Sequence, residues 1–101
     1  MNLRQIHHVA IIVSDYKKSR KFYVETLGFQ IIRENYRPSR GDYKLDLKLE
    51  GCELELFSAS GNPPRPSYPE ACGLRHLAFR VDDMDAAIAE LREKGIETEP
   101  V

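Results

Sequence analysis

The sequence predicts an α+β domain built from two βαβββ modules, of which the second is truncated at its C-terminal end. A strand-like segment runs into an amphipathic helix twice, over residues 6–27 and again over residues 74–94. Two further segments, residues 44–50 and 53–56, alternate polar and apolar side chains as half-buried strands do. The chain has 101 residues, which is enough for one hydrophobic core but not for two independent ones.

The first module begins with a strand at residues 6–13, which are rich in β-branched side chains. A Ser-Asp pair follows, and both residue types cap helices by accepting hydrogen bonds from free backbone N–H groups. Apolar residues recur at helical spacing over residues 16–27, and Gly28 is typical of the residue that ends a helix. A second strand is expected at residues 29–36.

The third and fourth strands form a predicted hairpin. Residues 37–42 contain Pro38 and Gly41 and are expected to turn the chain into it. The two alternating segments then pair around Gly51 and present one apolar face. Residues 58–73 include four prolines, so we expect a long connection without regular structure there.

The second module repeats the first. Residues 74–83 match residues 6–15 position by position, so that His76 corresponds to His8. A helix is expected over residues 84–94, capped by an acidic pair and ended by a glycine. The last strands of the first module have no counterpart, and we expect about three strands, roughly 20 to 35 residues, to be missing. The predicted single domain, residues 1–101, divides into the first module 1–58, a linker 59–73 and the incomplete second module 74–101.

Strand parity places candidate metal ligands on one face of the sheet. Successive side chains of a strand point to opposite faces, so His8 points away from the helix if Val9 packs beneath it. By the same parity Glu55 points away from the helix-facing Leu56, and His76 takes the position that matches His8. Two imidazoles and one carboxylate suit Zn, Ni, Co, Mn or Fe(II) and leave coordination positions open for substrate. We therefore predict one divalent metal ion as the cofactor.

Two neighbouring residues compete with these ligands. The parity of His7 directs it toward the helix layer or the start of the strand, so we interpret it as structural or exposed. Glu53 shares the face of Glu55 but lies next to the turn, where a carboxylate is solvated. Glu55 lies deeper in the strand and is flanked by leucines that fix its orientation.

Charged side chains indicate the kind of partner. Fifteen basic and sixteen acidic residues give a formal net charge of -1, and the absence of a basic face argues against a nucleic-acid partner. Arg80 shares the parity of His76 and is our candidate for binding an anionic group of a small-molecule substrate. The less favoured alternatives are Arg37, Arg40, Lys44 and Arg65.

Localisation and assembly follow from apolar runs and sheet edges. The apolar run at residues 9–13 is too short for a signal-peptide core or a membrane span, so we expect a cytoplasmic protein without a membrane partner. Cys52 and Cys72 lack zinc-binding spacing and are expected to be reduced. A truncated second module leaves backbone groups on a sheet edge that a second copy can cover, so we expect a homodimer.

Four segments resemble the vicinal-oxygen-chelate superfamily, and most closely its glyoxalase I-like branch. They are residues 8–15, residues 19–29 (SRKFYVETLGF), residues 53–57 and residues 74–83. The resemblance implies paired βαβββ modules, the glyoxalase/dihydroxybiphenyl dioxygenase-like fold, in which a curved sheet surrounds one metal ion. It makes His8, Glu55 and His76 the metal ligands and places a fourth ligand, usually a glutamate, beyond Val101.

The resemblance also implies a metal-dependent lyase or isomerase similar to lactoylglutathione lyase. Its substrate would be a small vicinal-oxygen compound such as the hemithioacetal of a 2-oxoaldehyde and a thiol. The metal would stabilise an enediolate while Glu55, the expected catalytic residue, moves the proton. The alternatives on the same scaffold are a thioester epimerase, an Fe(II) dioxygenase and a non-catalytic protein that binds a small molecule.

Overall fold

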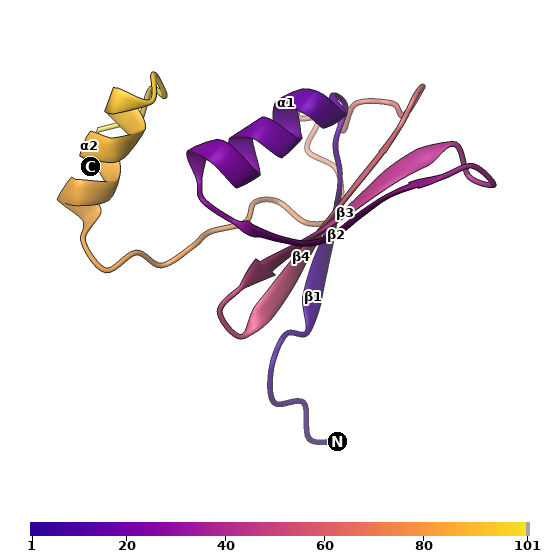
Figure 1. Ribbon diagram of the computed structural model, residues 1–101, viewed down its shortest axis with the longest axis horizontal. Coiled ribbons are helices and arrows are strands. Elements are labelled where there is room, and N and C mark those ends of the chain that lie inside the picture. The colour runs from indigo at the N-terminus through magenta and orange to yellow at the C-terminus, as the bar shows by residue number, and fades with distance from the viewer. Residues whose placement is uncertain (101) are drawn as a thin grey trace. The chain divides into compact units, whose positions relative to one another are not determined.

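The computed structural model describes residues 1–100, and the chain divides into two compact units with the boundary after Pro64. The first unit holds one complete βαβββ module (Figure 1). Its elements are β1 (His8–Ile12), α1 (Tyr16–Arg20), η1 (Lys21–Thr26), β2 (Gln30–Arg37), β3 (Asp42–Leu49) and β4 (Cys52–Ala59). The predicted order of one strand, one helical segment and three strands is confirmed, and with it the α+β class.

The helical segment begins and ends where the sequence predicts. The Asp15 side chain accepts a hydrogen bond from the backbone N–H of Lys18 at 3.1 Å and so caps α1. Gly28 follows the segment with a φ of 84°, a left-handed conformation that glycine adopts without steric cost. The second half, η1, is a π-helix, and its last turn is closed by the Leu27 N–H, which donates to the Phe22 carbonyl at 2.9 Å. The helical periodicity did not predict this change of helix type.

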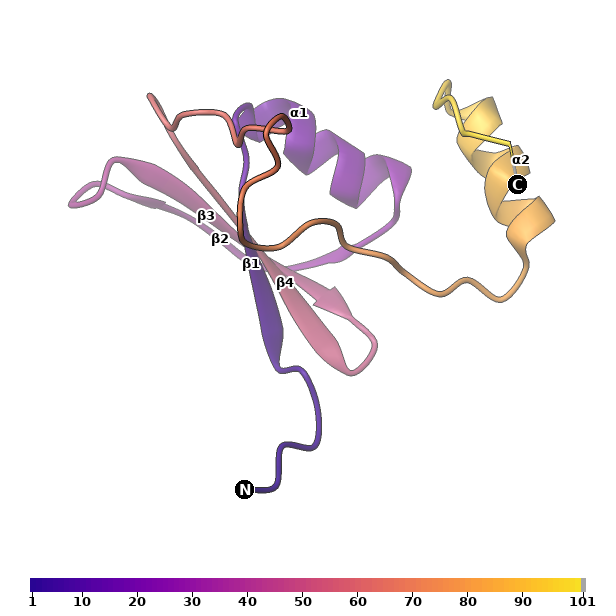
Figure 2. The ribbon, with the colours of Figure 1, turned by 180° about the vertical axis from the view of Figure 1, so that it is seen from behind.

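The four strands form one mixed sheet in the order β1-β4-β3-β2. β1 runs parallel to β4, whereas β3 is antiparallel to both of its neighbours. Figures 1 and 2 show this twisted sheet from opposite sides, with α1 on one side of it. In the β1–β4 register Ala10 lies beside Glu55 and Ile12 beside Phe57. The first and last strands of the module, which are far apart in sequence, are therefore neighbours in space.

The hydrophobic core of the first unit lies on the helix side of the sheet. Four leucines of β3 and β4 are buried there, namely Leu45, Leu47, Leu54 and Leu56. Side chains of β1 and of the helical segment pack against them, including Val9, Ile11, Tyr16, Tyr23 and Val24. The expectation that Val9 and Leu56 face the helix is confirmed. Strand alternation then leaves His8 and Glu55 on the opposite face, which we call the open face.

The second unit contains the helix α2 (Met84–Glu93), which the sequence predicts. The Asp83 side chain accepts a hydrogen bond from the Ala86 N–H at 3.0 Å, and Gly95 follows the helix with a φ of 78°. The expectation of a strand at residues 74–81 is wrong, because that segment has no regular secondary structure. A strand is stabilised by backbone hydrogen bonds to a neighbouring strand, and residues 65–100 contain no strand that could pair with this segment.

The described helices are short. None of those within residues 1–100 has the length and apolar composition needed to cross a membrane.

We expect Leu56→Ala to lower the free energy of unfolding by about 2 to 5 kcal/mol. Leu56 is 0% exposed, so truncation removes apolar contacts and leaves a cavity that the close-packed core fills only in part. Urea unfolding followed by circular dichroism measures the change. Leu49→Ala is the matched control at a site 36% exposed at the end of β3, and it should cost clearly less. Equal losses in the two variants would contradict the assigned core.

Candidate metal centre

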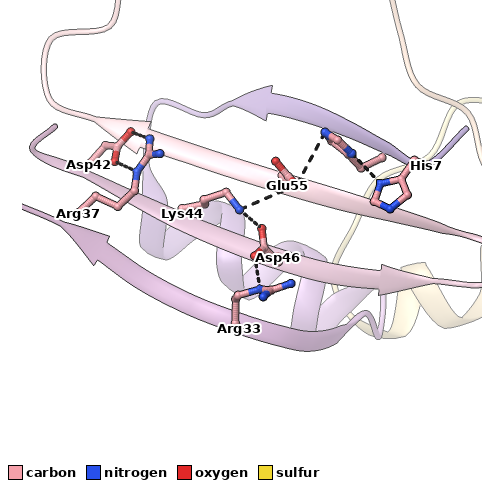
Figure 3. A network of polar contacts seen from close by, with 8 residues as sticks. His7, Arg33, Arg37, Asp42, Lys44, Asp46 and Glu55 are labelled. Atoms are coloured by element: carbon pink, nitrogen blue, oxygen red, sulfur yellow. Dashed lines mark hydrogen bonds and ion pairs between the residues drawn. The ribbon is translucent and has the colours of Figure 1, made fainter.

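β1 and β4 bring His8 and Glu55 together on the open face. The two strands are adjacent and parallel, and Glu55 lies beside Ala10, two residues after His8. His8 Nε2 is 3.8 Å from Glu55 Oε2, and their side chains are 45% and 18% exposed. Figure 3 shows Glu55 within the network of polar side chains on this face. Both groups can therefore be reached by a ligand from solvent.

The donor atoms of this pair fit a divalent metal ion. Imidazole nitrogen and carboxylate oxygen bind Zn²⁺ at about 2.0 to 2.2 Å, which at the tetrahedral angle places two ligand atoms roughly 3.3 to 3.6 Å apart. The 3.8 Å between His8 and Glu55 exceeds this range by an amount that a small side-chain rotation removes. Within residues 1–100, no group of three or more His, Cys, Asp or Glu side chains is arranged to hold a metal. The first unit thus supplies two donors of the predicted three.

The predicted ligand His76 and the predicted substrate-binding residue Arg80 belong to the second unit. Both residues are exposed and lie within residues 74–81, which form no strand. The strand parity that assigned them to one face therefore has no basis there. The role of His76 stays a prediction from the sequence repeat, and that of Arg80 a prediction from its spacing to His76.

His7 contacts His8 rather than the helix layer. The two Nδ1 atoms are 2.9 Å apart, and the rings meet edge to face with their centroids 5.1 Å apart. One of these nitrogens donates a hydrogen bond and the other accepts it. The Nδ1 atom of His8 is hydrogen-bonded to His7, and the other ring nitrogen, Nε2, faces Glu55. Hydrogen bonds to the second ring nitrogen orient metal-binding imidazoles in the same way.

Asp46 is the buried charge of the open face, and the sequence analysis missed it. It is 1% exposed and lies beside Glu55 in the β3–β4 register. Its Oδ1 accepts a hydrogen bond from Lys44 Nζ at 2.8 Å, and its Oδ2 lies 2.7 Å from Arg33 Nε without hydrogen-bond geometry. The signal was present in the sequence, since Asp46 alternates with buried leucines of β3 as Glu55 does in β4.

A pocket of about 430 Å³ opens beside Glu55 on the open face. Its apolar lining comes from Ala10, Ile12, Phe57 and Ala59, and its polar lining from Arg37, Arg40, Asp42 and Asn62. Ala10 is the register neighbour of Glu55, and Phe57 follows Glu55 by two residues on the same face. A small molecule in this pocket would therefore lie close to the strand position of Glu55.

Arg37 is fixed in this pocket by two neighbours. Its Nε and Nη2 donate to the two carboxylate oxygens of Asp42 at 2.7 and 2.6 Å, and its guanidinium lies 5.0 Å from the centre of the Phe57 ring. These hydrogen bonds lower the pKa of Asp42, and the positive charges of Arg37 and Arg40 lower it further. The charge of Arg37 is therefore compensated by a carboxylate within the pocket.

The chain belongs to the glyoxalase/bleomycin resistance protein/dioxygenase superfamily, whose family model matches residues 5–101. It is 61% identical to the uncharacterized protein YwkD of Bacillus subtilis, over 100% of this chain and 80% of the relative. The crystal structure of a glyoxalase family protein from Enterococcus faecalis matches with a TM-score of 0.91 and 58% identity. That match covers 99% of this chain and 79% of the other. The resemblance inferred from the sequence motifs is thus confirmed.

Enzymes occur among the more distant relatives. The human mitochondrial methylmalonyl-CoA epimerase is 31% identical over 94% of this chain and 56% of its own length. A probable lactoylglutathione lyase from Synechocystis is 31% identical over 87% of this chain and 68% of its own length. The superfamily therefore includes proteins named for two reactions, which makes the particular reaction of this chain a separate question.

We expect the contribution of Asp42 to stability to vanish in acid. Its pKa is lower in the folded chain than the unfolded value of about 3.9, so the stabilisation is complete above that pH and is lost as the pH falls through the folded value. In urea unfolding, the stability difference between wild type and Asp42→Asn should be largest near neutral pH and should shrink below about pH 4. Asp82→Asn, an exposed change, is the control. A difference that is constant with pH would refute the assignment.

Proposed function

We propose that this chain belongs to a metal-dependent isomerase or lyase of the glyoxalase I type. The substrate would be a small vicinal-oxygen compound such as the hemithioacetal of a 2-oxoaldehyde and a thiol. The observation that carries the proposal is the pairing of His8 Nε2 with Glu55 Oε2 at 3.8 Å on the open face. An exposed nitrogen and oxygen donor set next to a pocket of about 430 Å³ is what a small chelating substrate requires.

His8 and Glu55 are the proposed metal ligands in the first unit. A divalent ion bound there, such as Ni, Zn, Co, Mn or Fe, would supply Lewis-acid polarisation of the substrate oxygens. His76 is the proposed third ligand because it matches His8 in the sequence repeat, and Arg80 is the proposed substrate-binding residue because of its even spacing from His76 in the sequence. His7 supports the site indirectly, because its contact with His8 Nδ1 holds the imidazole with Nε2 toward Glu55.

Glu55 is the proposed catalytic base. Its carboxylate is 18% exposed and lies beside Ala10, which lines the pocket, so it would accept the proton from a carbon next to a carbonyl group and return it to the adjacent carbon. The apolar side chains of Ala10, Ile12 and Phe57 would exclude water from the bound carbon skeleton. Proton movement between neighbouring carbons neither adds nor removes atoms, which is the net change in an isomerisation.

Epimerisation of a 2-acyl thioester is the second candidate. It is supported by the 31% identity to the human methylmalonyl-CoA epimerase over 94% of this chain. The chemistry required of Glu55 is similar, because a proton again leaves and rejoins a carbon next to a carbonyl. The two candidates differ in substrate, so an assay with both substrate classes separates them.

We expect the full-length protein, supplied with Ni, Co or Zn, to isomerise the hemithioacetal of methylglyoxal and a thiol. Glu55→Gln should lower kcat by about 100- to 10,000-fold, because the amide cannot accept the proton. Ultraviolet absorbance of the thioester product measures the rate. Glu53→Gln is the matched control on the same face of β4 and should keep activity. Full activity in Glu55→Gln, or no turnover of either substrate class with any of the metals, would refute the proposal.

Metal content tests the ligands independently of turnover. His8→Ala, Glu55→Ala and His76→Ala should each lower the metal bound per chain, whereas His7→Ala should retain the metal with weaker affinity. Elemental analysis of the dialysed variants provides the readout. Unchanged content in the His8 and Glu55 variants would overturn the assigned site.

We also propose that the protein assembles as a homodimer. β1 lies at one end of the sheet order and, among residues 1–100, pairs with β4 alone, so its outer backbone groups are available to a second copy. Light scattering after size exclusion should give twice the mass of the chain. A monomeric mass at micromolar concentration would refute this assembly.

A further inference from the structure

Lys44 lies between two carboxylates of the open face. Its Nζ donates to Asp46 Oδ1 at 2.8 Å and lies 3.9 Å from Glu55 Oε2 (Figure 3). It also lies 5.7 Å from the centre of the Phe57 ring, and its side chain is 25% exposed. The ammonium group is thus held close to Asp46 and within the electrostatic range of Glu55.

The same oxygen of Glu55 is near both Lys44 and His8. Glu55 Oε2 is 3.9 Å from Lys44 Nζ and 3.8 Å from His8 Nε2. A divalent ion held by His8 and Glu55 would therefore share its carboxylate ligand with a fixed positive charge. Two cations drawn to one carboxylate repel each other, and the repulsion is weakly screened where solvent access is limited.

We propose that Lys44 lowers the metal affinity of the His8–Glu55 pair by competing for Glu55, and that Asp46 limits this competition by holding Lys44. The inference rests on the proposed function only in taking His8 and Glu55 as metal ligands. Asp46 is suited to this role because it is buried and lies beside Glu55 in the register. Lys44 Nζ is 2.8 Å from Asp46 Oδ1 but 3.9 Å from Glu55 Oε2, so Asp46 is its nearer partner.

Arg33 makes it feasible to remove the charge of Lys44 by mutation. Its Nε lies 2.7 Å from Asp46 Oδ2, so this buried carboxylate keeps a positive neighbour when Lys44 is replaced. Methionine preserves most of the aliphatic length of Lys44 and its packing near Phe57 while it removes the charge. Lys44→Met thus removes the positive charge near Glu55 while the Asp46 carboxylate keeps its ion pair with Arg33.

Titration calorimetry of the full-length protein with Co²⁺ alone tests the proposal. Lys44→Met should bind Co²⁺ about tenfold more tightly than wild type, and Asp46→Asn, which frees Lys44 to pair with Glu55, about tenfold more weakly. Lys44→Arg keeps the charge and should stay within about threefold of wild type. Opposite signs for Lys44→Met and Asp46→Asn are the signature, because a merely structural role would weaken binding in both.

Controls separate the possible failures. Lys48→Met removes the same charge from the same strand at a position beside Glu53, two residues away from Glu55, and should leave the affinity unchanged. Urea unfolding confirms that each variant is folded. Loss of affinity in Lys44→Met, or unchanged affinity in both Lys44→Met and Asp46→Asn, overturns the inference while the proposed function stands. Wild-type protein without His8-dependent Co²⁺ binding overturns both.

Discussion

The alternation of leucines with polar side chains along β3 and β4 is the constraint on which the rest of the first unit depends. In register, Leu45 lies beside Leu56 and Leu47 beside Leu54, and all four are buried against the helix layer. A slip of one residue would turn these leucines to the other face and bring charged residues into the core. The hydrophobic core therefore fixes which face carries the candidate ligands. The parallel pairing of β1 with β4 then brings His8 near Glu55, so the site depends on packing on the far side of the sheet.

The same register creates an electrostatic problem on the open face. Asp46 and Glu55 are direct cross-strand neighbours, and like charges in that arrangement repel. Asp46 is also 1% exposed, and the desolvation of a carboxylate costs several kcal/mol unless opposite charges compensate it. Lys44 and Arg33 provide that compensation at 2.8 and 2.7 Å. Lys44 therefore compensates part of the Asp46 charge, and its distance to Glu55 follows from its position beside Asp46.

Short-range patterns were sufficient to predict much of this architecture, and two of the failures share one physical cause. The caps at Asp15 and Asp83 and the face of Glu55 depend on residues within a few positions of one another, so the sequence contains all the necessary information. Residues 74–81 carry an equally good strand pattern but form no strand, because pairing depends on a partner segment that no local pattern supplies. The burial of Asp46 was not predicted for the same reason. Strand parity gives the face on which Asp46 lies, but its burial depends on side chains that meet only in the folded sheet.

The tandem histidines link backbone geometry to ligand chemistry at β1. If His8 donates its Nδ1–H to His7, its Nε2 carries the free electron pair that a metal needs. In the other tautomer Nε2 carries the proton, and at 3.8 Å from Glu55 Oε2 that proton makes no normal hydrogen bond. The pairing with Glu55 thus gives the second tautomer little stabilisation. The 2.9 Å contact with His7 is compatible with both tautomers, because His8 Nδ1 can donate or accept in it, and a bound metal would select the first one. His7, which strand parity excluded as a ligand, would accordingly act on the site by orienting the His8 imidazole.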